Sequence, residues 1–222
     1  LVGANRSLNR GASIRPAVVS AAVLVSVLTV AWRVLTFSGF QNDHFVHLAR
    51  AQQVLLGDLP IRDFVDPGMP LMYLTSAAAW MLWGGSPGTE LLLVSAAFAI
   101  GAACTVMVAH RLTGSILLAV VAALLELLIA PRTYSYPKVL LYAAAMCVMV
   151  AVVESPSRRR VILAAALTAV AFLFRHDHGI YIGIATAVTV ALATSNLGWQ
   201  TMARRVALFA SAAMGGSAPR FP

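Results

Sequence analysis

Residues 16–37 read PAVVSAAVLVSVLTVAWRVLTF, a stretch that contains a single charged side chain. An α-helix needs about 20 mainly apolar residues to cross the hydrocarbon core of a bilayer. The stretch has this length, and it is too long for the apolar core of an ordinary secretory signal peptide. Arg6, Arg10 and Arg15 precede it. We therefore expect an uncleaved first membrane span that follows a cytoplasmic segment, residues 1–15.

The composition of the whole chain indicates a membrane protein with several spans. Of the 222 residues, 60% are hydrophobic and only 11% are charged, whereas a soluble domain carries about 25% charged residues. A transmembrane β-barrel would show short alternating segments instead of long apolar runs. The net charge of +8 does not indicate a nucleic-acid partner, because the basic residues form short clusters between apolar runs. The predicted fold class is an all-α, polytopic bundle of transmembrane helices.

The arginines predict which side of the membrane each segment occupies. The run MPLMYLTSAAAWMLW (69–83) is short and carries two tryptophans, as interfacial helices often do. If it lies in the outer interface, the arginines at 158–160 fall on the same side as those of the N-terminus, as the positive-inside rule requires. We therefore expect a large extracytoplasmic loop, residues 38–88, with interfacial helices. The remaining transmembrane helices are expected at about 89–109, 115–130, 138–153, 161–174, 179–195 and 203–214.

Two further expectations concern the limits of the chain and its location. We expect an N-terminal piece of a longer protein, with residues 215–222 as its truncated end. The predicted location is the plasma or inner membrane, with the N-terminus in the cytoplasm. Cys104 and Cys147 both fall inside apolar runs, so we interpret them as buried hydrophobic side chains without a metal-binding pattern.

Polar and titratable residues gather where helices reach the outer side. The first such stretch is FQNDHFVH (40–47), and it follows the first span directly. With the predicted topology, the segments 62–66, 132–138 and 175–178 reach the same side. We expect these segments to share one outer cavity.

Such a cavity suits sugar transfer from a lipid-linked donor. A polyprenyl phosphate or diphosphate departs as a stable anion, so it needs cationic side chains rather than a general acid. The acceptor hydroxyl needs one carboxylate as a general base. A single displacement of this kind inverts the anomeric carbon.

Two stretches resemble the GT-C class of membrane glycosyltransferases, which includes protein O-mannosyltransferases and lipid A aminoarabinose transferases. The first is NDHFVHLARAQQVLLGDLPIRDFVDPGMPLMYLTSAAAWMLWG (42–84), and the second is FLFRHDHGIYIGIA (172–185). In that class an acidic residue follows the first span, and a Pro-initiated interfacial helix follows an Arg-Asp-Phe-like segment. The resemblance implies that Asp43 is the catalytic acidic residue. That class often has a second acid beside the first, and His44 takes this place here. No metal ligands are assigned, and a divalent metal is left open.

Several candidate residues have a structural interpretation beside the functional one. Asp43 is either the base or a helix N-cap. Lys138, the only lysine, either binds the carrier phosphate or extends toward lipid headgroups, and the same holds for Arg132. Asp63 either orders its loop or binds sugar, and Glu126 is either a functional or a structural carboxylate inside a span. The candidates for binding substrate are His44, Arg62, Asp63, Arg132, Lys138, Arg175, Asp177 and His178.

The sequence therefore predicts a glycosyltransferase that moves a sugar from a polyprenyl-phosphate donor to an extracytoplasmic lipid, glycan or protein acceptor. Membrane lipids are the other expected partners. A transporter or flippase of lipid-linked or cell-envelope precursors is the first alternative. Transporters place polar sites near the bilayer midplane, whereas here polar residues gather at helix ends. An inactive scaffold relative is the second alternative.

Overall fold

The computed structural model describes residues 16–217, so the segments predicted at 1–15 and at the end of 215–222 lie wholly or partly outside the described residues. Apart from one isolated β-bridge, between Pro60 and Phe64, the regular structure of the described part is helical. The predicted all-α class is therefore confirmed. The elements are α1 (Pro16–Leu35), α2 (Asn42–Leu55), α3 (Pro70–Trp83), α4 (Pro87–Thr113), α5 (Ile116–Leu128), η1 (Thr133–Ser135), α6 (Tyr136–Glu154), α7 (Arg158–Phe174), α8 (His176–Thr194), η2 (Ser195–Leu197) and α9 (Trp199–Ser217).

Four helical segments are long and apolar enough to cross a membrane, which makes the chain a multi-pass membrane protein. They are Pro16–Leu35, Pro87–Thr113, Thr133–Glu154 and His176–Leu197. Helix α5 is apolar but has only 13 residues. Several helices begin earlier than the apolar runs suggest, because a proline is tolerated in the first turn, where no intrahelical N–H bond is needed. Pro137 of α6 and Pro87 of α4 are examples.

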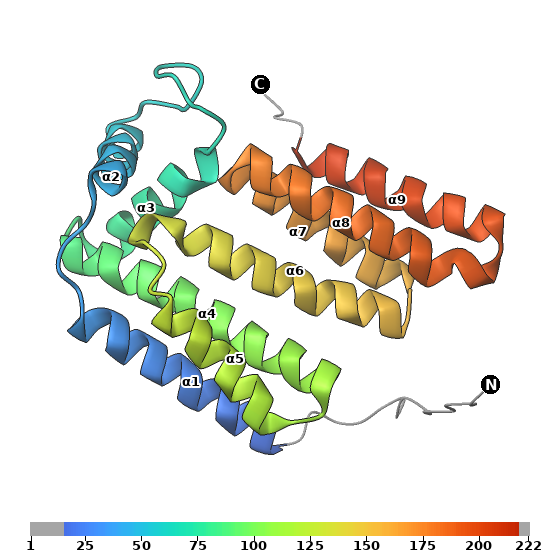
Figure 1. Ribbon diagram of the computed structural model, residues 1–222. Helices are drawn as coiled ribbons and strands as arrows, with labels where there is room; N and C mark the ends of the chain where they lie inside the picture. Colours follow the sequence, from blue (N-terminus) through green and yellow to red (C-terminus); the bar gives the residue numbers. More distant parts are fainter. Residues whose placement is uncertain (1–15, 218–222) are drawn as a thin grey trace.

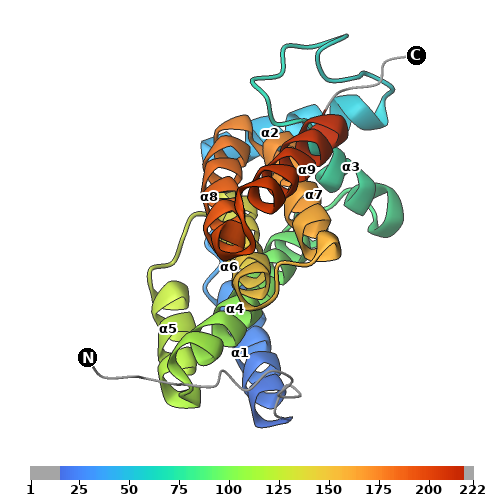
Figure 2. The ribbon, with the colours of Figure 1, turned by 90° about the vertical axis from the view of Figure 1, so that its right-hand side faces the viewer.

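Seven helices, α1 and α4 to α9, form an up-and-down bundle (Figures 1 and 2). The last turn of α1 and the first turns of α4, α6 and α8 lie at the same end of this bundle, on the left in Figure 1. We call it the loop end. Helices α2 and α3 also lie there, so the chain between α1 and α4 leaves and re-enters the bundle at one end.

Two of the four apolar clusters of the described residues lie in different parts of the bundle, and α6 connects these parts. One core joins α1, α4 and α5 through small residues such as Ala102, Ala119 and Ala123. The other joins α6 to α9 and includes Val161 and Phe209. Helix α6 packs against α4 on one side and against α7 and α8 on the other. Small side chains let helix backbones approach closely, which is how helices associate in membranes.

A tight turn before α3 connects the loop to the bundle. The Asp66 carboxylate accepts hydrogen bonds from the backbone N–H groups of Gly68 and Met69, at 2.9 and 2.8 Å. Aspartate commonly stabilises turns in this way. The carbonyl of Gly68 in turn accepts the backbone N–H of His176 at 3.2 Å. The loop is therefore attached to the first turn of α8.

Candidate functional site

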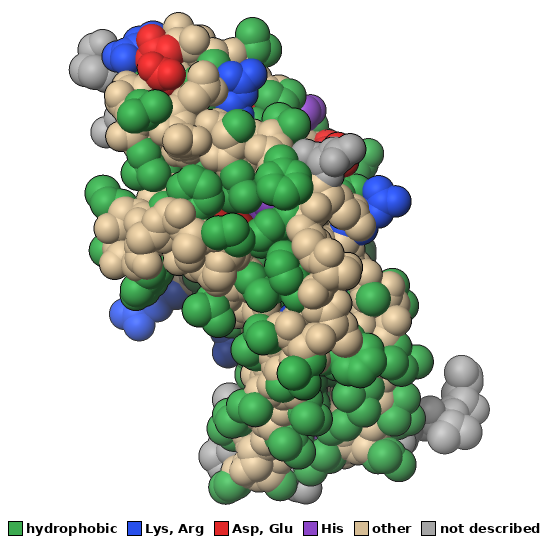
Figure 3. Space-filling model, turned by 90° about the vertical axis from the view of Figure 1, so that its left-hand side faces the viewer, with side chains coloured by type: hydrophobic (Ala, Val, Ile, Leu, Met, Phe, Trp, Pro, Cys, Tyr) green, Lys and Arg blue, Asp and Glu red, His purple; other side chains and the backbone are tan. Residues whose placement is uncertain are grey.

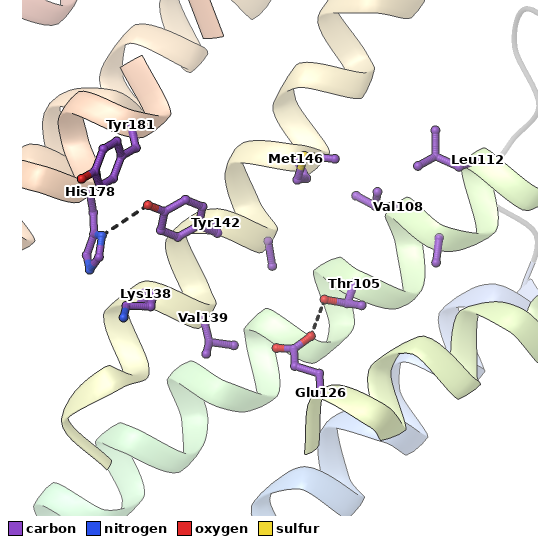
Figure 4. Close-up of a pocket in the computed structure, with 12 residues that line it drawn as sticks. Thr105, Val108, Leu112, Glu126, Lys138, Val139, Tyr142, Met146, His178 and Tyr181 are labelled. Atoms are coloured by element: carbon purple, nitrogen blue, oxygen red, sulfur yellow. Dashed lines mark hydrogen bonds between the residues drawn. The ribbon is translucent and has the colours of Figure 1, made fainter. Parts of the chain in front are cut away.

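A groove of about 750 Å³ runs along the side of the bundle (Figure 4). Its floor comes from α4 and α6, and its two walls come from α5 and α8. Most of the floor is apolar, with Val108 and Leu112 on α4 and Met146 on α6. The polar residues are Lys138 in the first turn of α6, His178 in the first turn of α8, Tyr142 and Tyr181 about one turn further along, and the pair Thr105 and Glu126 farther from the loop end. The groove is therefore amphipathic, with Lys138 and His178 toward the loop end.

One polar side of the groove combines Lys138 and Tyr142 of α6 with His178 of the α8 wall (Figure 4). The Tyr142 hydroxyl lies 3.3 Å from Nδ1 of His178. Lys138 is exposed and sits in the first turn of α6. These groups are cation and hydrogen-bond partners of the kind that bind phosphate.

The opposite wall carries Glu126, near the end of α5. Thr105 donates its hydroxyl to Oε2 of Glu126 at 2.6 Å. Behind it, Arg33 donates to the carbonyl of Pro131 at 2.7 Å, and its guanidinium lies 3.8 Å from the centre of the Phe98 ring. Glu126 and Arg33 also line a second, very small cavity together. Both charged side chains of this region therefore have polar or aromatic neighbours inside the bundle.

Asp43 is exposed at the start of α2, at the loop end. The N-cap position of α2 is held by Gln41, so the interpretation of Asp43 as the N-cap is wrong. Arg132 lies close enough to be influenced by this carboxylate: a hydrogen bond from Arg132 to the Tyr134 hydroxyl and the charge of Asp43 both raise the pKa of Arg132. Asp43 and Arg132 are thus two exposed charges in the region where α2 contacts η1.

The segment 175–178 forms a compact charged turn. Nε of Arg175 lies 3.0 Å from Oδ1 of Asp177, and the same oxygen accepts the backbone N–H of His178 at 2.8 Å. Of these three residues, His178 lines the groove. Arg175 and Asp177 remain partly exposed beside it.

Arg62 and Asp63 are two of the candidates that do not line the groove. Arg62 and Asp63 pair with each other at 2.7 Å on the exposed loop between α2 and α3. The hydrogen bond from Arg62, together with one from the Leu59 backbone, lowers the pKa of Asp63. The loop that carries the pair lies at the top of Figures 1 and 3, and Figure 3 shows charged side chains there, above a largely hydrophobic face. The hydrogen bonds of the pair order this loop and do not involve the residues of the groove.

His44 is buried in a cluster that includes a carboxylate the sequence did not single out. Nε2 of His44 lies 3.0 Å from Oε1 of Glu90, and each side chain is only 1% exposed. Ser76 donates its hydroxyl to the same oxygen at 3.0 Å. Phe40 stacks on the His44 ring, with the ring centres 4.3 Å apart. A carboxylate in the first turn of an apolar span was the one signal for Glu90 in the sequence.

His47 and Tyr73 lie next to this cluster, with their ring centres 5.8 Å apart. Burial, and next the charge of His44, lowers the pKa of His47. Burial also raises the pKa of Tyr73 to about 12. Both side chains are therefore held in their neutral forms near neutral pH. Within residues 16–217, no three His, Cys, Asp or Glu side chains come together in a way that could hold a metal ion.

These features define a class: an α-helical, multi-pass membrane protein with an amphipathic groove along its side. No protein-family model, curated protein or solved structure matches the chain. The class therefore rests on the helices and on the groove.

Proposed function

We propose that the protein is a membrane glycosyltransferase of the GT-C type. It transfers a sugar from a polyprenyl-phosphate donor to a lipid, glycan or protein acceptor, with inversion at the anomeric carbon. We place it in the plasma or inner membrane, with the loop end and the reaction on the extracytoplasmic side. The return of the chain to the loop end after α3 supports this topology, because α3 then does not cross the bundle.

The groove is the observation that carries the proposal. A polyprenyl phosphate has a long apolar chain and an anionic head. The apolar floor along α4 and α6 suits the chain, and Lys138 with His178 at the polar part suits the head. Charge-assisted hydrogen bonds to phosphate are among the stronger polar contacts in proteins.

The reaction needs a base at the loop end. Asp43 accepts the proton of the acceptor hydroxyl, whose oxygen attacks the anomeric carbon. The bond from that carbon to the phosphate oxygen breaks, and its electron pair leaves with the phosphate. Lys138 stabilises the developing negative charge, and Arg132 and Arg175 add positive charge nearby. The products of the donor are the glycosylated acceptor and the lipid phosphate.

One observation favours a second function, a lipid flippase. Glu126 lies on the wall of a groove along the side of the bundle, within an apolar helix. Ionisable residues inside membrane segments often mark transport pathways. A flippase would move the lipid phosphate across reconstituted vesicles without forming a glycosidic bond, so product analysis separates the two functions.

Photo-crosslinking of a lipid tests the groove. A polyprenyl phosphate with a photoreactive chain should label peptides from α4 and α6 of the purified protein. Lys138→Ala should weaken labelling by about 10-fold to 150-fold, as expected for a lost charge-assisted contact of about 1.5–3 kcal/mol. Arg159→Ala, a cation at the opposite end of the bundle, is the matched control and should label normally. Equal labelling of the Lys138 variant and the parent would contradict the proposed head-group site.

A further inference from the structure

Helix α2 buries two histidines, whereas two of its large apolar side chains remain exposed. The buried side chains are His44, His47, Leu48 and Ala51, which recur at the spacing of one helical face. Phe45 and Val46, on another face, are 55% and 58% exposed. Burying an unpaired polar ring costs free energy, whereas burying Phe or Val is favourable. The polar contact of His44 offsets part of the cost of burying its ring and so favours the observed rotation of α2.

The polar contact of His44 is with Glu90. The carboxylate of Glu90, on α4, lies 3.0 Å from Nε2 of His44 on α2 and accepts the hydroxyl of Ser76 on α3 at 3.0 Å. One oxygen atom thus joins three helices. Directional bonds of this kind between buried groups specify one arrangement among several that would pack equally well.

We infer that His44, Glu90 and Ser76 form a positioning cluster that sets the rotation of α2 and thereby places Asp43 at the surface. Asp43 precedes His44 directly, and one residue turns the helix by about 100°. A rotation that buries Phe45 and Val46 would move Asp43 away from its present place at the surface, where α2 contacts η1 and Arg132 directly precedes η1. The cluster touches no substrate and acts through Asp43, and in this it rests on the proposed role of Asp43 as the base.

The test measures the rotation directly, without reference to sugar transfer. Cysteines are introduced by Asp43→Cys and Arg132→Cys in a background in which Cys104 and Cys147 are replaced by alanine, and a short bis-maleimide joins them. Glu90→Leu should slow cross-linking by about tenfold or more, because loss of a hydrogen bond to a buried charged group is worth at least that factor. In the same variant, a cysteine placed by Phe45→Cys should become less reactive toward a water-soluble thiol reagent.

A second, compensating substitution distinguishes an effect on the rotation of α2 from a general loss of packing. His44→Leu added to Glu90→Leu should restore cross-linking, because an apolar residue at 44 again favours burial of this face. Glu90→Gln should largely retain it, since an amide oxygen still accepts both bonds. His47→Leu is the matched control, because it removes the other buried imidazole of the same face. It should cross-link at the parental rate.

The inference is overturned if Glu90→Leu cross-links at the parental rate, or if His47→Leu slows cross-linking as much as Glu90→Leu does. Should Glu90→Leu fail to accumulate, Ser76→Ala decides: slower cross-linking supports the inference and an unchanged rate overturns it. In a transfer assay, Glu90→Leu should lower kcat and leave KM for the lipid donor unchanged, because the groove is untouched. If the parent protein transfers no sugar, the proposed function fails, whereas the cross-linking result still decides the rotation of α2.

Discussion

Gly68 and His176 are in direct contact, and this contact attaches the loop between α2 and α3 to α8. The backbone N–H of His176 donates to the Gly68 carbonyl at 3.2 Å. Gly68 has a φ of +92°, and a Cβ there would lie 2.5 Å from Nδ1 of His176. Gly68→Ala should therefore lower the free energy of unfolding by about 1–3 kcal/mol, through backbone strain and overlap with the ring.

Thermal unfolding in detergent measures this loss. Gly57→Ala is the matched control, because Gly57 also has a positive φ, +103°, but has open space around a Cβ. Gly57→Ala should lower the free energy of unfolding only by the cost of backbone strain. Equal losses in the two variants would show that the contact with His176 contributes nothing to stability.

Gly179 lets α7 and α8 approach closely. A Cβ at this position would overlap with the backbone of Phe172 on α7. Gly179→Ala should destabilise the protein by about 1–3 kcal/mol, as overpacking does. Gly215→Ala on α9, where a Cβ would meet open space, should instead stabilise it by about 0.5–1 kcal/mol. A Gly179 variant as stable as the parent would refute this close approach.

His47 makes stability depend on pH. Burial lowers its pKa in the folded protein below the ordinary 6.5. The unfolded chain therefore takes up a proton near pH 6.5, whereas the folded protein does so only at lower pH. Stability should be highest above about pH 6.5 and should fall as the pH drops from there toward the folded pKa.

His47→Gln removes the group that causes this fall. Unfolding temperatures of the parent and the variant are compared from about pH 7.5 down to about pH 5. The parent should lose more stability over this range than the variant. Parallel curves would mean that His47 is protonated as easily in the folded protein as in the unfolded chain.

Because the chain returns to the loop end after α3, we can predict on which side of the membrane three exposed positions lie. Cysteines from Ser38→Cys, before α2, and Gly88→Cys, after α3, should both react with a membrane-impermeant thiol reagent in intact cells. A cysteine from Ser155→Cys, between α6 and α7, should react only with a permeant reagent. All are tested without Cys104 and Cys147. Labelling of positions 38 and 88 from opposite sides would show that α3 crosses the membrane.

The fold class could be predicted from the sequence because a bilayer imposes length and hydrophobicity on each span. The stretch 16–37 shows this, since α1 covers 16–35. Helix starts were harder to predict, as Pro137 lies inside α6 rather than before it.

The partners of the polar residues could be predicted much less well. The sequence placed Lys138 and His178 at helix ends, and the groove brings both to one side. It gave no reason to join His44 to Glu90, which is 46 residues away. Their contact depends on how α2 and α3 fold back on α4. Nor did it show that Arg62 would pair with its own neighbour on an exposed loop.

Sugar transfer by the Asp43→Asn variant measures whether Asp43 is the general base. Asp43 is exposed and is not the N-cap of α2, so the variant should insert and unfold like the parent. The assay follows transfer from a polyprenyl-phosphate sugar to acceptor in membranes that contain the full-length protein at matched expression. We predict that the rate falls by about 10²-fold to 10⁴-fold, as for a lost general base. An Asp43→Asn variant that transfers sugar at the parental rate would show that Asp43 is not the general base.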